Sequence, residues 1–428
     1  MKDKNLAFLI GLLASSNIFY IFRLNTFCLW FDIVVSLIIF FKILFKKKLS
    51  YCLSKTSKFF NFFALFCFLS LIPCLIYNID RLDFVMSCVY GLIELIIIYI
   101  YYLAIIYLKN EEEYITNGIL IGLILNILYS IIQYVGFNSS KVISFAYLFP
   151  NSSFQISGVY DVLYYDSIQT TLKIYFYRAS GFFLETSYFF IYCIGALFVI
   201  KRTPKVAKSN LLYSILVLAT VILMFMSKTE NLVIFLIIYT IYLICDKFIE
   251  KKGLKIRKDT LLKFSILVIT FVLSLGLFKE FRNLINTSVS NGIEYLSNIT
   301  FNDQSSNARF KSINDGLDLF LTHPFGIGYN TSAKTINLMY NDVSIFSTFM
   351  SLLVEIGIVG STFYWLFPLK SVFLLFKSKK KKNIILGFAT LSLIILQITN
   401  GISISKLHFI MLVYCLADIN ARKLNINE

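Results

Sequence analysis

Long apolar stretches separated by short charged ones dominate the chain. About twelve of them have the length and hydrophobicity of membrane-spanning helices. A backbone in lipid must satisfy its own hydrogen bonds, so the pattern predicts a bundle of helices. The expected fold is an all-α polytopic membrane protein with one integral membrane domain over residues 1–428. The predicted spans lie near 6–22, 27–45, 59–77, 84–107, 115–135, 186–200, 211–226, 231–245, 263–278, 344–367, 384–399 and 404–419.

Two of these segments, 186–200 and 231–245, are short for a full span. Such a segment tilts little, borrows flanking residues, or lies against protein rather than lipid. Composition supports the membrane interpretation, because 58% of the 428 residues are hydrophobic, more than a soluble domain can bury.

Charge then predicts the topology. With both termini and every second loop assigned to the cytoplasm, that side holds 28 of the 40 Lys and Arg residues. The positive charge is thus explained by orientation in the membrane, and nucleic acid is not expected as a partner. Residues 6–22 lack a small-residue cleavage site and are interpreted as a first span rather than a cleavable signal.

Metal and disulfide chemistry find little support in the sequence. The eight cysteines are scattered without a CxxC pair, and there are two histidines. Neither a disulfide framework nor a histidine metal centre is expected, and no cofactor is predicted.

Two outer loops are much longer than the other connections, about 136–185 and 279–343. Long loops in a compact bundle are uncommon unless they are functional. The first is rich in Ser, Asn and Tyr, side chains that suit sugar rings. An aromatic belt at the membrane interface explains the tyrosines equally.

The first loop ends in YRASGFFLETSY, which begins at Tyr177. It places a guanidinium (Arg178), a flexible backbone point (Gly181) and a carboxylate (Glu185) at a predicted membrane surface. If a helix begins between Phe182 and Ser187, Glu185 lies in its first turn, where the helix dipole favours a carboxylate. The alternative is that Arg178 is an interfacial anchor and Glu185 only a helix-end residue.

The second loop contains NARFKSINDGLDLFLTHPFGIGYN. Apolar residues between Ala308 and Leu321 recur at helical spacing, which predicts a helix on the outer membrane surface with Arg309 near its start. Pro324 cannot continue that helix, and Gly326 and Gly328 permit a tight turn. His323 stands at the helix end; it is a candidate catalytic group or, alternatively, a capping group.

A third polar cluster, Ser227-Lys228-Thr229-Glu230-Asn231, forms the whole outer connection between two predicted spans. Lys228 and Glu230 are candidate substrate ligands, although a plain turn has the same appearance. Within spans, Glu94 is the one clear carboxylate, and Gln133 and Gln397 are polar but uncharged.

Taken in order, RASGFFLETS, SKTEN and NARF…THPFGIGYN resemble the O-antigen polymerase and O-antigen ligase superfamily. The closer resemblance is to Wzy-type polymerases of capsular or exopolysaccharide clusters. It implies a GT-C-like bundle in the bacterial cytoplasmic membrane, and a metal-independent glycosyltransferase that joins undecaprenyl-diphosphate-linked oligosaccharides at the outer face. The chain-length regulator and the flippase of the same pathway are the partners it implies.

For that reaction, Arg178, Lys228 and Arg309 are the cations expected to bind the diphosphate. Glu185 is expected to position or deprotonate the acceptor hydroxyl, with His323 as second choice. Tyr177 and Glu230 are expected to contact the substrate, at its diphosphate or its sugar. The family often has Arg where this chain has Lys228, and lysine loses the bidentate fork for phosphate.

Two alternatives remain open. The ligase branch resembles this chain at Glu355, Gly357 and Gly360, but Phe346 occupies the position of the histidine of that branch, which favours a polymerase. A lipid-linked-oligosaccharide flippase or another twelve-span transporter is the rival from a different class. No internal repeat and few charges within spans are found here, which disfavours it.

Overall fold

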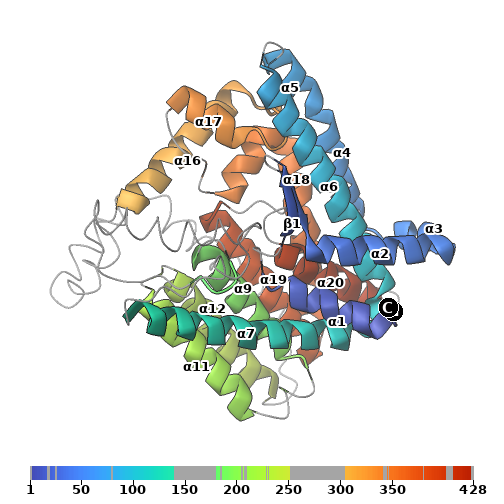
Figure 1. Ribbon diagram of the computed structural model, residues 1–428, viewed down its shortest axis with the longest axis vertical. Coiled ribbons are helices and arrows are strands. Elements are labelled where there is room, and N and C mark those ends of the chain that lie inside the picture. The colour runs from blue at the N-terminus through green and yellow to red at the C-terminus, as the bar shows by residue number, and fades with distance from the viewer. Residues whose placement is uncertain are drawn as a thin grey trace.

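The computed structural model describes residues 2–16, 20–24, 27–78, 81–138, 180–183, 186–203, 206, 210–227, 229, 231–250, 304–340, 345, 347–378, 380–401 and 408–425. Figure 1 shows these residues as a bundle of helices with one short strand pair. The helices are α1 (Asp3–Leu13), α2 (Phe31–Phe45), α3 (Leu49–Ser54), α4 (Lys58–Leu69), α5 (Leu71–Asn78), α6 (Leu82–Tyr107), η1 (Lys109–Glu111), α7 (Glu112–Asn138), α9 (Thr186–Ile200), α11 (Asn210–Met226), α12 (Asn231–Glu250), α16 (Gln304–Thr322), α17 (Ser332–Tyr340), α18 (Thr348–Lys377), α19 (Lys381–Thr399) and α20 (His408–Asn425).

Five helical segments of the described chain are long and apolar enough to cross a membrane. Four further apolar helices, at Ile33–Phe45, Thr186–Ile200, Leu211–Met226 and Asn231–Asp246, are shorter. The chain is therefore a multi-pass helical membrane protein, while the number twelve stays a prediction. The predicted span 263–278 lies outside the described residues. The five long segments are Lys58–Tyr77, Leu82–Tyr107, Lys109–Val135, Thr348–Lys377 and Lys381–Thr399.

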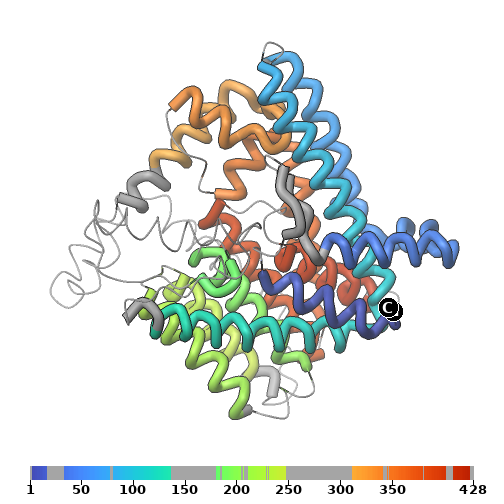
Figure 2. Tube along the Cα trace, in the orientation of Figure 1, coloured from blue at the N-terminus to red at the C-terminus, as the bar shows by residue number. Residues whose placement is uncertain are grey.

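The N-terminal region differs from the two spans predicted at 6–22 and 27–45. Helix α1 ends at Leu13, and an antiparallel hairpin of β1 (Tyr20–Leu24) and β2 (Phe27–Trp30) precedes α2. The reason lies in a contact with α7, which runs beside α1 (Figure 2). The Asn126 side chain donates a hydrogen bond to the Ser15 carbonyl at 2.8 Å, so the chain after α1 is fixed by a polar partner that the hydropathy of α1 does not indicate.

Helix α9 forms the centre of the bundle. Residues 188–200 are all buried, and α9 packs on α7, α11, α12, α19 and α20. A helix that is apolar on every side is stable only when protein or lipid surrounds it completely. Of the three explanations for the short segment 186–200, the structure selects burial against protein.

Charged groups join the helix ends that the charge pattern assigns to the cytoplasm. Their mutual contacts show that these ends share one side of the bundle, although which side faces the cytoplasm stays a prediction. The ion pairs are Lys42–Asp3 at 2.5 Å, Arg202–Glu112 at 2.5 Å, Lys381–Asp246 at 3.0 Å and Lys201–Asp246 at 4.0 Å.

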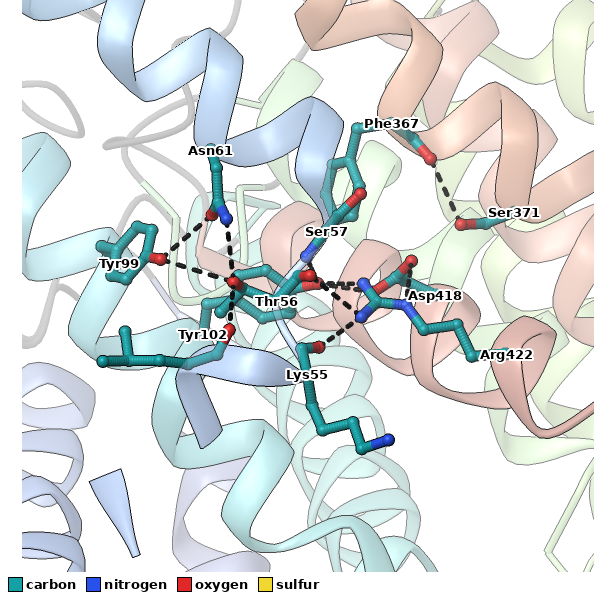
Figure 3. Close-up of polar contacts among 11 residues, drawn as sticks. Lys55, Thr56, Ser57, Asn61, Tyr99, Tyr102, Phe367, Ser371, Asp418 and Arg422 are labelled. Atoms are coloured by element: carbon teal, nitrogen blue, oxygen red, sulfur yellow. Dashed lines mark hydrogen bonds and ion pairs between the residues drawn. The ribbon is translucent and has the colours of Figure 1, made fainter. Parts of the chain in front are cut away.

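A polar network on the same side ties α20 to α6 and to the connection between α3 and α4 (Figure 3). Arg422 forms an ion pair with Asp418, which also accepts a hydrogen bond from the Tyr102 hydroxyl at 2.5 Å. The guanidinium donates to the backbone carbonyls of Lys55 and Thr56 at 2.5 and 3.0 Å. Three segments far apart in sequence are thereby held at one point.

Candidate functional site

The end of the RASG segment, at Ser180 and Gly181, and the following Phe182 are held by two amide side chains of α7. Gln133 Oε1 accepts the backbone N–H groups of Ser180 and Gly181 at 3.3 and 3.1 Å. Asn126 Oδ1 accepts the N–H of Phe182 at 2.9 Å. Both amides are buried in an otherwise apolar helix, and such polar groups need a partner inside the bundle. Here the partner is the backbone that leads into α9.

Gly181 is required for this arrangement. Its φ is +55°, a conformation that L side chains rarely adopt, and a Cβ there would lie 2.6 Å from Asn126 Oδ1. Gly181, predicted as a flexible point, is held in a conformation that favours glycine. Helix α9 begins at Thr186, directly after Glu185 in the sequence. Tyr177, Arg178 and Glu185 themselves lie outside the described residues.

The SKTEN segment reaches the same end of α7. The hydroxyls of Tyr134 and Ser227 are 2.7 Å apart, and Ser227 is fully buried. Tyr134 follows Gln133 directly, so adjacent residues of α7 contact the RASG and SKTEN segments. The structure thus anchors two motifs, which are separated by about forty residues of sequence, at one end of α7. Lys228 and Glu230 lie outside the described part of the chain.

The third motif forms α16, a turn and the start of α17. The helix predicted between Ala308 and Leu321 is confirmed as α16, which ends at Thr322, two residues before Pro324. Gly326 and Gly328 have φ of +93° and +123°, which confirms the tight turn. Arg309 lies within α16 rather than at its first turn; its side chain is not among those described.

His323 follows α16 and contacts the end of that helix. Its Nδ1 lies 2.9 Å from Thr322 Oγ1 and 3.3 Å from the carbonyl oxygen of Leu319. The ring also meets Tyr77 edge to face, with centroids 4.7 Å apart. These contacts fit the capping interpretation, and a catalytic role for His323 stays a prediction.

The start of α17, after this turn, contacts a buried carboxylate of α18. Ser332 Oγ donates to Glu355 Oε1 at 2.5 Å, and Glu355 is 8% exposed. Glu94 is half-buried in α6, which fits an ionisable residue in a span.

The sequence did not single out Asn126, and it marked Gln133 only as an uncharged polar residue within a span. A signal was available, since amide side chains in an apolar span need a hydrogen-bonding partner. Within the described residues no group of three His, Cys, Asp or Glu side chains is placed to hold a metal ion.

Residues 213–365 match the family model described as O-antigen ligase. No curated protein matches the chain. The matched segment contains SKTEN, α16, the glycine turn and the first part of α18. The match confirms the resemblance to the O-antigen polymerase and ligase superfamily for this multi-pass membrane protein.

Proposed function

We propose that this chain is a polysaccharide polymerase. It joins undecaprenyl-diphosphate-linked oligosaccharide repeat units at the outer face of the bacterial cytoplasmic membrane. The observation that supports the proposal is that the RASG and SKTEN segments contact adjacent residues of α7, Gln133 and Tyr134. Two motifs of the superfamily resemblance then contribute to one site, and the family match includes the second of them.

The reaction breaks the bond between the anomeric carbon of the growing chain and its lipid diphosphate. A hydroxyl oxygen of the new lipid-linked unit forms a bond to that carbon, and the diphosphate leaves with the electron pair. Arg178, Lys228 and Arg309 stabilise the negative charge on the leaving diphosphate. Glu185 takes the proton of the hydroxyl, with His323 as the second candidate base. Tyr177 and Glu230 bind sugar in this scheme.

Gly181 lies four residues before the proposed base, Glu185. Because Gln133 and Asn126 fix the backbone at residues 180–182, the segment that carries Glu185 starts from a defined position. A base must lie within hydrogen-bond reach of its proton, so such anchoring matters for the rate.

A ligase of the same superfamily is the second candidate, favoured by the description of the matched family. A ligase transfers a finished chain from the lipid diphosphate to a different acceptor. Phe346 stands where the ligase pattern has its histidine, and this difference favours the polymerase. A flippase would not need cations and carboxylates gathered in outer loops.

A strain that lacks the protein tests the proposal when its surface polysaccharide and lipid-linked intermediates are both resolved by size. Loss of long polymer with single repeat units at the outer face supports the polymerase, and Glu185→Gln should reproduce it. Long polymer retained on undecaprenyl diphosphate means a ligase. Single units trapped at the inner face mean a flippase. Unchanged polymer in Arg178→Ala, Glu185→Gln and Arg309→Ala would overturn the assignment of roles.

A further inference from the structure

The turn His323–Asn330 packs between α5 and α18. A Cβ on Gly328 would lie 2.6 Å from the Cβ of Cys74 in α5. A Cβ on Gly326 would lie 2.5 Å from the backbone oxygen of Glu355 in α18. The two glycines therefore permit a close approach of the turn to both helices.

Helix α18 is broken where the turn meets it. Gly357 has φ +70° and ψ −179°, which interrupts the helical hydrogen bonding. The carbonyls of Val354 and Glu355 instead accept the N–H groups of Ile327 and Gly328, both at 3.0 Å. In an unbroken helix those carbonyls would accept from residues four positions further on.

Helix α18 also donates a hydrogen bond to the turn. The N–H of Ile358, released by the break, donates to the carbonyl of Pro324 at 3.4 Å, and the N–H of Gly326 donates to the His323 carbonyl at 2.9 Å. The next residue, Tyr329, donates its N–H to Ser70 Oγ at 2.9 Å. Non-helical backbone is tolerated at membrane depth only where protein supplies its hydrogen bonds in this way.

The two candidate spans that the turn contacts place it at about the same depth in the membrane. The candidate span Thr348–Lys377 has 30 residues and at ~1.5 Å per residue is longer than a ~30 Å hydrocarbon core; centred on that core, it places Gly357 about 6 Å inside the boundary. The candidate span Lys58–Tyr77 has 20 residues and places Cys74 about 5 Å inside its outer end.

The side chain of Phe325 projects from the turn and is 82% exposed. Apolar residues of the neighbouring spans are exposed around it, Ile358 at 54% in α18 and Ile76 at 68% in α5. Exposed apolar side chains on membrane-spanning helices face lipid, and the backbone of Phe325 contacts Gly357 in the middle of this surface.

We infer that Pro324–Gly328 is a re-entrant turn whose Phe325 side chain is inserted into the hydrocarbon of the adjacent membrane leaflet. The occupant of this surface is lipid, because the exposed faces of two candidate spans are continuous with it. His323, two residues earlier, is then held at the boundary between lipid and water. This placement does not depend on the proposed reaction.

The test uses the full chain in vesicles of phosphatidylethanolamine and phosphatidylglycerol, with the photoreactive residue p-benzoylphenylalanine at position 325. Position 72, where Ile72 is 56% exposed within a candidate span, is the lipid-facing control. Position 334 is the aqueous control, because Lys334 forms an ion pair with the exposed Asp83 at 3.6 Å. We expect position 325 to form lipid adducts about as efficiently as position 72, and about tenfold more than position 334.

Lipid adducts at position 325 no more abundant than at position 334 would overturn the inference. An adduct at position 325 to another part of the chain would also overturn it. A second readout is a spin label on Phe325→Cys, whose collisions with oxygen should exceed those with a water-soluble nickel chelate. The opposite ratio contradicts the inference. Neither readout requires the protein to be active, so both are independent of the polymerase proposal.

Discussion

Gln133 Oε1 in α7 accepts the backbone N–H of Gly181 at 3.1 Å, across 48 positions of sequence. The contact connects an apolar span to the segment that precedes α9. Because Tyr134 beside it meets Ser227, one end of α7 organises two motifs that the sequence presents separately.

Gln133→Met removes the acceptor of two backbone N–H groups while keeping the size of the side chain. An unsatisfied buried donor costs ~1–3 kcal/mol, so we expect about a tenfold loss of polymer with the folded protein still present in the membrane. Quantitative gels of polymer against protein level measure this. Ile132→Met, on the neighbouring exposed position, is the control and should be neutral. Equal polymer from both variants would contradict the anchoring role.

Lys228→Arg keeps a cation and adds the bidentate guanidinium group of the arginine that the family often has at this position. We expect it to retain polymer synthesis, whereas Lys228→Met removes the positive charge that we propose binds the leaving diphosphate and should lower the transfer rate by about 100-fold or more. Transfer from purified lipid-linked donor measures the rate. Full activity of Lys228→Met would remove this residue from the proposed site.

Gly357→Ala places a Cβ 2.7 Å from the backbone of Phe325 and Pro324, at a φ of +70°. A backbone at φ +70° and ψ −179° is adopted essentially by glycine alone and costs ~1–3 kcal/mol for an L residue, and the contact adds to it. We expect a lower unfolding temperature in detergent and reduced lipid adducts from position 325. Ser361→Ala, one turn further along α18 and also buried, should have a much smaller effect.

Arg422→Met leaves the Asp418 carboxylate, which is 8% exposed, without its cationic partner. Removing one partner of a buried pair costs ~3 kcal/mol or more, so the variant should lose thermal stability in detergent. The double variant Asp418→Asn with Arg422→Met should recover part of that loss. If the single and double variants were equally unstable, the ion pair of Figure 3 would not be the cause.

Several local features follow from sequence because they depend on a few neighbouring residues. The spacing of Phe310, Ile313 and Leu317 predicted α16, and Pro324 limited its extent. Gly181 and Gly326 marked points of unusual backbone, and both have positive φ. The segment 6–22 was predicted wrongly as one helix, because hydropathy does not register the hydrogen bond between Asn126 and Ser15.

By itself, the sequence determined that the chain crosses a membrane several times, which helix ends share a side, and which superfamily it resembles. Those properties depend on composition, on the distribution of charge and on short motifs. Tertiary structure decided that Gln133 and Tyr134 join two motifs, that α9 is surrounded by protein, and that the turn at Pro324 fills a break at Gly357. These contacts depend on which backbone groups are left without hydrogen-bond partners when the helices pack. The pattern of neighbouring residues in the sequence does not encode this.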